Sequence, residues 1–98
     1  MGIISFKDKA TEDINYGKSN KSAIRKLPKE LHKKAQICLA KLGAATSLGD
    51  LKTIRGNRFE ALRGDRKGQY SIRVNDQYRL CFEWAGQNAL EVEIVDYH

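Results

Sequence analysis

The sequence has few of the features that mark secreted, membrane or metal-dependent proteins. Its 98 residues include two cysteines and one proline, and no apolar run is long enough to span a membrane. Two cysteines cannot form the disulfide framework of a small secreted domain, and no Cys/His spacing resembles a zinc site. The start of the chain does not resemble a signal peptide. We therefore expect one cytoplasmic domain over residues 1–98, with no metal, cofactor or membrane contact.

The charge is basic overall and unevenly distributed. Eighteen Lys and Arg face twelve Asp and Glu, a formal net charge of +6. Basic side chains dominate residues 18–41 and 52–79, whereas no Lys or Arg follows Arg79. This polarity favours a polyanionic partner such as nucleic acid, or an acidic protein, although a merely soluble basic domain has the same composition. The acidic end is a solvated strand edge or, as a weaker alternative, a carboxylate metal site formed by Glu91, Glu93 and Asp96.

Apolar residues in the first half of the chain recur at helical spacing. We expect a strand at residues 3–6, a helix at 8–16, a loop at 18–25, a helix at 28–43 and a short helical turn at 45–51. The helix at 28–43 begins at Pro28, a favoured first helical residue, and ends at Gly43. Cys38 lies on its apolar stripe and is predicted to be buried. His32 lies off that stripe and is predicted to face solvent.

After Gly56 the apolar residues alternate with polar ones, which is the period of a β-strand. We expect strands at residues 59–63, 70–74, 78–84 and 90–94, joined by short turns. Helices followed by an antiparallel meander indicate an α+β fold, with two N-terminal helices packed on one face of a mainly antiparallel sheet. Cys81 falls on the polar face of its strand. No histidine base is evident beside it, so a thiol nucleophile is not expected.

The alternation also predicts which side chains meet on the opposite face of the sheet. If Ile72 pairs with Leu80 on the core side, Arg73 lies directly across from Arg79. Like charges that face each other destabilise a sheet by up to about 1 kcal/mol. A purely structural sheet tends to avoid such a pair, so the two arginines indicate an anion-binding surface.

The strand at residues 59–63 extends this surface. Matching Leu62 with Tyr70 places Arg63 beside the two arginines. The same alternation points Glu60 at the core, where an unpaired carboxylate is unfavourable. We therefore expect a bulge in this strand, which would change where Arg63 points.

The final strand adds two side chains with acid–base or stacking chemistry. Pairing Leu80 with Ile94 sets Tyr97 near Arg79, with His98 just beyond it. Arginine holds phosphate and stabilises a phosphorane-like transition state, and histidine shuttles protons near neutral pH. This combination matches metal-free RNA cleavage in which the 2′-OH of the RNA attacks. The alternative is a terminal histidine that is merely solvated.

Four segments resemble a known family. The strongest is GNRFEALRGDRKGQYSIRVNDQYRLCFEW at residues 56–84, and the ending VEIVDYH at residues 92–98 is also typical. The segments at residues 28–35 and 44–51 match as well. Together they cover nearly the whole chain and resemble the HigB (host inhibition of growth) toxins of the RelE/ParE superfamily. These are the toxin halves of bacterial type II toxin–antitoxin pairs.

The resemblance implies a RelE-like, microbial-RNase-type fold and ribosome-dependent cleavage of mRNA in the A site. By position, Arg79 matches an arginine that stabilises the transition state, and His98 matches the acid/base beside Tyr97. Arg63 lies where some members carry a catalytic lysine, and Glu60 where some carry a histidine. We further expect four basic side chains to bind RNA: Arg58, Arg66, Lys67 and Arg73.

The resemblance also implies partners. It predicts a HigA-type helix-turn-helix antitoxin, the ribosome and its mRNA, and operator DNA reached indirectly through the antitoxin complex. Two alternatives stay open. Relatives in the superfamily poison DNA gyrase without catalysis, and the glutamate at position 60 is compatible with a weakened toxin that acts mainly within the antitoxin–operator complex.

Overall fold

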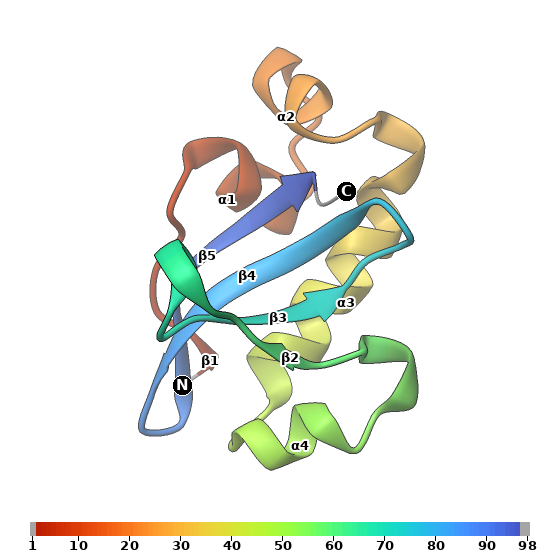
Figure 1. Cartoon of the computed structure of the whole chain (residues 1–98). Coiled ribbons are helices and arrows are strands. Elements are labelled where there is room, and N and C mark those ends of the chain that lie inside the picture. The colour runs from red at the N-terminus through yellow and green to blue at the C-terminus, as the bar shows by residue number, and fades with distance from the viewer. Residues whose placement is uncertain (1, 97–98) are drawn as a thin grey trace.

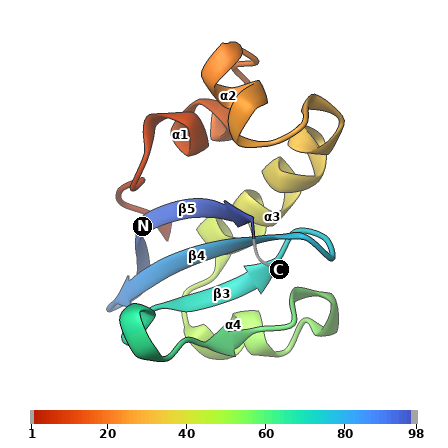
Figure 2. The same cartoon turned by 45° about the horizontal axis from the view of Figure 1, so that its top comes forward.

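The computed structural model describes residues 2–96. Its elements in chain order are β1 (Gly2–Ile3), α1 (Lys9–Asn15), α2 (Lys21–Lys26), the 3-10 turn η1 (Lys29–Leu31), α3 (His32–Ala44), α4 (Leu48–Lys52), η2 (Arg55–Asn57), β2 (Glu60–Ala61), η3 (Gly64–Arg66), β3 (Tyr70–Arg73), β4 (Tyr78–Ala85) and β5 (Asn88–Asp96). Figures 1 and 2 show α1 and α3 on one face of the sheet, with α2 lying beyond α1. The expected α+β fold is confirmed.

Within the described residues the strands form one five-stranded sheet in the order β1-β5-β4-β3-β2. The long hairpin of β4 and β5 lies at its centre, and β3 and β2 continue it antiparallel. Only β1 runs parallel to its neighbour, β5. The expected strand at residues 3–6 is thus confirmed as a short edge strand, continued by a single bridge between Phe6 and Val92.

The core lies between the sheet and the helices. Its fully buried members include residues of α1, α3, β3, β4 and β5, together with Leu27 after α2 and Leu51 of α4: Ile14, Leu39, Leu42, Ile72, Leu80, Phe82 and Ile94. Cys38 packs in this cluster as predicted, and its thiol donates to the backbone carbonyl of Arg73 at 3.4 Å. This contact joins α3 to the end of β3.

Helix α1 begins and docks through side-chain hydrogen bonds. Asp8 is its N-cap, and its carboxylate accepts from the Thr11 backbone amide at 3.0 Å. The Thr11 hydroxyl donates to the same carboxylate and accepts from the Ile94 amide of β5 at 3.1 Å. The helix expected at residues 8–16 is therefore confirmed, and its cap also fixes it to the sheet.

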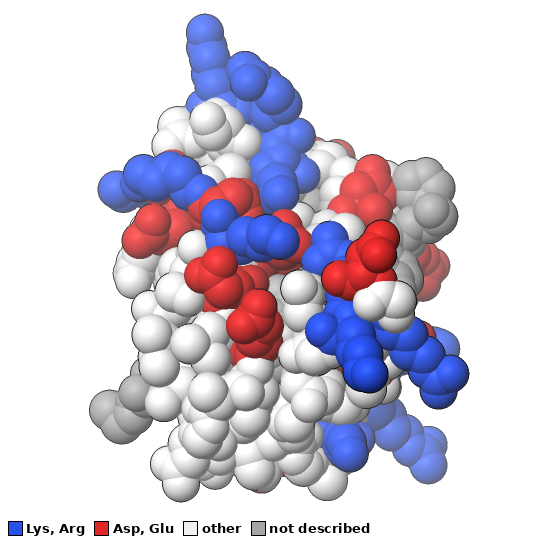
Figure 3. All heavy atoms as spheres, turned by 60° about the vertical axis from the view of Figure 1, so that its left-hand side comes forward, with Lys and Arg blue, Asp and Glu red and all other residues white. Residues whose placement is uncertain are grey.

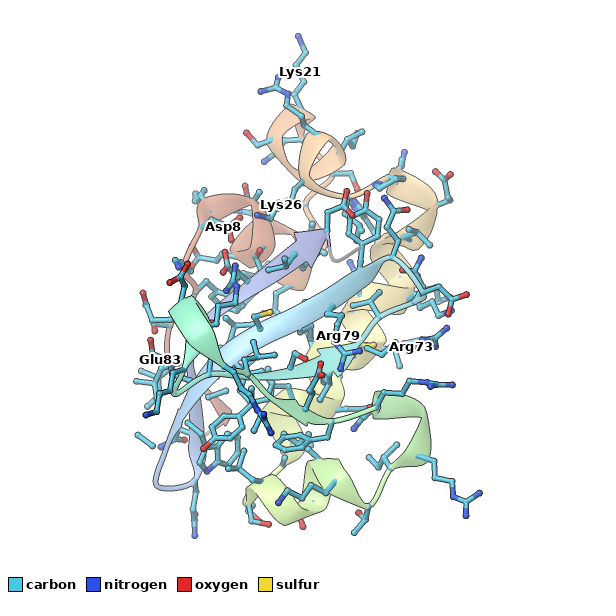
Figure 4. The ribbon with its side chains drawn as sticks, in the orientation of Figure 1. Asp8, Lys21, Lys26, Arg73, Arg79 and Glu83 are labelled. Atoms are coloured by element: carbon cyan, nitrogen blue, oxygen red, sulfur yellow. The ribbon has the colours of Figure 1, made fainter. Side chains whose placement is uncertain are left out.

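The loop expected at residues 18–25 is wrong, because Lys21–Lys26 form the short helix α2. Its N-cap is Asn20, which accepts from the Ala23 amide at 2.9 Å. Lys26 of α2 lies 3.6 Å from the capping carboxylate of Asp8 (Figure 4). Only Ala23 is buried within the helix, so six mostly polar residues give no periodic signal.

The solvent-facing position predicted for His32 is also wrong. The residue is buried where α2 folds over the start of α3. Its Nε2 lies 2.8 Å from the Leu27 carbonyl and 3.2 Å from the Ala23 carbonyl. The imidazole thereby lies against the C-terminal end of α2, where the Ala23 carbonyl also accepts from the Leu27 backbone amide at 3.1 Å.

Two other expected segments differ from the structure only in detail. The helix expected at 28–43 starts with the 3-10 turn η1 and continues as α3 to Ala44. The turn expected at 45–51 is α4, capped by the hydroxyl of Ser47. Among the described residues no helix is long and apolar enough to cross a membrane.

A buried carboxylate joins α1 to α2. Asp13 is 3% exposed and accepts from Lys9 Nζ and Asn20 Nδ2, both at 2.8 Å. These donors hold the pKa of Asp13 below its ordinary value, the Lys9 hydrogen bond contributing most. Because Asn20 also caps α2, this carboxylate links the two helices through one side chain.

The lowered pKa of Asp13 predicts an acid-sensitive contribution to stability. Such a carboxylate stabilises the fold above its unfolded pKa of about 3.9 and loses this effect as pH falls through the folded pKa. We expect urea midpoints to fall below about pH 4, and to fall less steeply in Asp13→Asn. Urea titrations from pH 6 to 2.5 measure this. Asp65→Asn in η3 controls for the lost charge, and an unchanged slope in Asp13→Asn would contradict the assignment.

Candidate active site on the arginine face

The sheet face turned away from α1 and α3 carries Arg73 and Arg79, and we call it the arginine face. The register predicted for the two middle strands is confirmed: Ile72 pairs with Leu80, and Arg73 with Arg79. In Figure 4 both arginines lie in front of the sheet, close to each other. The core therefore dictates their proximity, because a one-residue slip would expose Ile72 and Leu80.

Arg79 is held across β3 by oxygen acceptors. Its Nε donates to the hydroxyl of the fully buried Ser71 at 2.8 Å, and its Nη2 donates to the Arg58 carbonyl. Nη2 also lies 3.5 Å from the Ser71 carbonyl. The guanidinium is thus directed from β4 towards the segment that precedes β2. A planar group with five donors in fixed positions is well suited to a phosphate.

Arg73 is held differently. Its Nη2 lies 2.6 Å from Asp76 Oδ1 in the turn between β3 and β4. The guanidinium lowers the pKa of the Asp76 carboxyl through this hydrogen bond and its charge. Arg73 therefore turns towards the hairpin turn and Arg79 towards β2, which reduces the repulsion between the two like charges.

The register predicted for the edge strand is wrong by one residue. Ala61, not Leu62, pairs with Tyr70, and Glu60 pairs with Ser71. Alternation therefore places Glu60 on the arginine face rather than towards the core, and no bulge is needed. The strand is only two residues long, so it has too few positions for a period to fix its register.

Arg63 does not reach the arginine face through this register. It is exposed, lies beyond the end of β2 and is the N-cap residue of η3. With residues 60–62 it lines a shallow polar depression at the sheet edge. Among the other basic residues, Arg58 is exposed with a left-handed φ of 44°, and Lys67 is exposed directly after η3.

Arg66 lies at the opposite side of the face, in an ion pair. Its Nη1 is 2.8 Å from Glu93 Oε1 on β5 and 2.9 Å from Gln69 Oε1, and Lys7 Nζ lies 3.7 Å from the same Glu93 oxygen. Figure 3 shows acidic and basic side chains interspersed on this side of the molecule, above an uncharged surface. The predicted RNA-binding group Arg66 is thus engaged with a carboxylate.

Cys81 is fully buried on this face, between Ser71 and Glu93 in the sheet register. The alternation of the sequence places Cys81 on the arginine face, as found, but does not predict that the residue is buried there. Burial raises the pKa of its thiol, and of Cys38 in the core. Both groups are therefore poor nucleophiles.

The final strand follows the predicted register up to a bulge. Leu80 pairs with Ile94 as expected, but the register shifts between Cys81 and Glu83. In β5 the left-handed residue is Glu91, with φ of 50°. The strand ends with Asp96, which pairs with Tyr78, the residue that precedes Arg79 in the sequence. The predicted site residues 97 and 98 lie outside the described residues.

The described residues offer no group of three or more His, Cys, Asp and Glu side chains arranged to hold a metal ion. This includes the acidic end considered above, as far as residue 96. Glu91 hydrogen-bonds Ser5, Glu93 pairs with Arg66 and Asp96 accepts from Gln77. These carboxylates therefore have separate partners.

The sequence of this chain matches those of known proteins. Residues 4–98 match the family model described as the RelE-like toxin of the type II toxin–antitoxin system HigB. Toxin HigB-1 of Vibrio cholerae is 41% identical over 88 residues, which is 89% of this chain and 88% of that protein. An uncharacterised protein of Haemophilus influenzae is 36% identical over 59 residues, 60% of this chain and 58% of that protein.

Solved structures show the same fold at lower identity. The YoeB–YefM complex of Staphylococcus aureus contains a chain with a TM-score of 0.53 and 18% identity, covering 100% of this chain and 99% of that one. The fold is thus that of RelE-type toxins. The chain belongs to the HigB-like family of type II toxins.

Burial of both cysteines predicts that neither thiol reacts in the folded protein. At pH 8, iodoacetamide should leave Cys38 and Cys81 unmodified for hours and alkylate both once urea unfolds the chain. Mass spectrometry of the intact protein counts the adducts. Rapid modification of Cys81 in the folded state would contradict this prediction.

Proposed function

We propose that this toxin is a ribosome-dependent mRNA endoribonuclease, which cleaves mRNA in the A site and so inhibits translation and growth. The observation that carries the proposal is the oriented guanidinium of Arg79 on the arginine face, in a chain of the HigB-like family. Arginine there stabilises negative charge on a phosphorane-like transition state. The ribosome supplies the alignment of the RNA, because one small face has few groups with which to arrange an in-line attack.

The proposed reaction needs no redox partner. The 2′-oxygen of the RNA attacks the adjacent phosphorus, and the bond from phosphorus to the 5′-oxygen breaks. We assign to His98 the proton transfers at these oxygens, as the family resemblance implies. Tyr97 completes the terminal pair of the site, where a tyrosine stacks on a base or donates its phenolic proton. Arg79 neutralises the phosphate. Arg63 supplies the positive charge at the position where some relatives carry a catalytic lysine. Four further side chains hold the backbone of the RNA: Arg58, Arg66, Lys67 and Arg73. For Arg66 and Arg73, a phosphate replaces the present carboxylate partners, Glu93 and Asp76.

The proposal includes an antitoxin. The solved S. aureus structures contain YoeB in complex with YefM, which supports a partner of this kind. We propose a HigA-type helix-turn-helix protein that neutralises the toxin in the cytoplasm and carries the complex to operator DNA.

The mutation that tests the function is Arg79→Ala. We expect it to lower cleavage by about 10²- to 10³-fold, the effect of removing one transition-state donor, and to abolish growth inhibition. Primer extension on a defined mRNA with programmed ribosomes measures cleavage, and circular dichroism checks the fold. Arg25→Ala, which removes an exposed arginine from α2, is the matched control.

Three other outcomes are informative. A folded Arg79→Ala variant that stays fully toxic would refute the assignment of the site. Cleavage by the wild type without ribosomes would indicate a free ribonuclease. No cleavage by the wild type would refute the proposal, and a supercoiling assay would then test the alternative of gyrase binding.

A further inference from the structure

We infer that Ser71 and the backbone carbonyl of Arg58 are positioning groups, which hold the Arg79 guanidinium in the orientation that catalysis requires. The inference rests on the proposed function, because it explains how the transition-state arginine is aligned. Neither group needs to contact the RNA. Each acts on the reaction through Arg79.

The hydroxyl of Ser71 is a buried acceptor for Arg79. The residue is fully buried, although it lies on the face opposite the main core, and its Oγ accepts from Arg79 Nε at 2.8 Å. Nε is the donor nearest the aliphatic stem of arginine. A bond at Nε therefore restricts rotation of the whole guanidinium plane, whereas a bond at one terminal nitrogen leaves the plane free to turn.

The second fixed point lies on a different segment. Arg79 Nη2 donates to the Arg58 carbonyl, which follows the 3-10 turn η2. With Nε held by β3 and Nη2 held before β2, the guanidinium is anchored at two atoms from two segments. Two anchors define the direction in which its other N–H groups point.

The Arg58 carbonyl is itself held in place. Arg58 has a φ of 44°, a left-handed conformation that is uncommon for residues other than glycine. The preceding residue, Asn57, is 1% exposed, and its Nδ2 donates to the Leu51 carbonyl of α4 at 3.1 Å. A buried amide thus ties η2 to α4 and keeps the left-handed residue in the position where its carbonyl meets Arg79.

Positioning should affect turnover more than substrate binding. The charge of Arg79 attracts the phosphate in any orientation, so KM depends mainly on its presence. Transition-state stabilisation depends on donors aimed at the developing charge. Loss of an anchor should therefore lower kcat and leave KM nearly unchanged.

The experiment is a mutant cycle on programmed ribosomes. We expect Ser71→Ala to lower kcat by about tenfold with KM within about twofold of wild type, and Ser71→Thr, which keeps the hydroxyl, to restore most of the activity. Ser22→Ala, an exposed serine of α2, is the matched control. In an Arg79→Ala background, Ser71→Ala should cause no further loss. An equal loss in both backgrounds would refute the positioning role.

A second readout is independent of activity and separates this inference from the proposed function. In ¹⁵N NMR spectra of the isolated protein, the Arg79 Nε–H should give a distinct, slowly exchanging signal that broadens or shifts towards that of free arginine in Ser71→Ala. Asn57→Ala removes the hydrogen bond that holds η2 on α4 and so loosens the Arg58 carbonyl. This variant should weaken the same Arg79 signal. A signal unchanged in both folded variants would overturn the inference, whether or not the wild type cleaves RNA.

Discussion

The pairing of β3 with β4 is the constraint on which the rest of the site depends. On the core side it buries Ile72 against Leu80, both with no exposed surface, and on the other side it places Arg73 across from Arg79. Burial of each apolar side chain contributes roughly 1.5–3 kcal/mol, whereas facing like charges cost up to about 1 kcal/mol. The free energy gained by burying Ile72 and Leu80 exceeds the repulsion between the two arginines. The register that buries the apolar pair therefore also sets Arg73 across from Arg79.

The structure offsets this repulsion by giving each arginine its own acceptors. Asp76 holds Arg73 towards the hairpin turn, and Ser71 with the Arg58 carbonyl holds Arg79 towards β2. The same contacts prepare the site, because a guanidinium that is already oriented loses little freedom when a phosphate binds. On the β5 side, Glu93 instead pairs with Arg66 and the face is closed over Cys81. The arginine face is therefore divided into a half that can meet an anion and a half that is internally neutralised.

The sequence predicted those parts whose signal is long and periodic. The alternation through β3 and β4 gave the correct register, and the apolar stripe of α3 gave a correct helix with Cys38 buried. Short elements were misjudged because they contain too little pattern. Helix α2 has one buried residue among six, so its sequence predicts a loop. Strand β2 has two residues, which are too few to define its register. His32 and Cys81 are buried by segments outside their own helix or strand. The apolar pattern of that helix or strand therefore does not predict their burial.

The position of Glu60 shows why family membership and fold do not by themselves define the chemistry of the site. Its pairing with Ser71 puts a carboxylate on the arginine face, one cross-strand neighbour from the hydroxyl that anchors Arg79. The side chain of Glu60 is exposed, and its negative charge opposes the approach of a phosphate to this face. This effect depends on one residue of a two-residue strand, and the fold shared by the family does not constrain it.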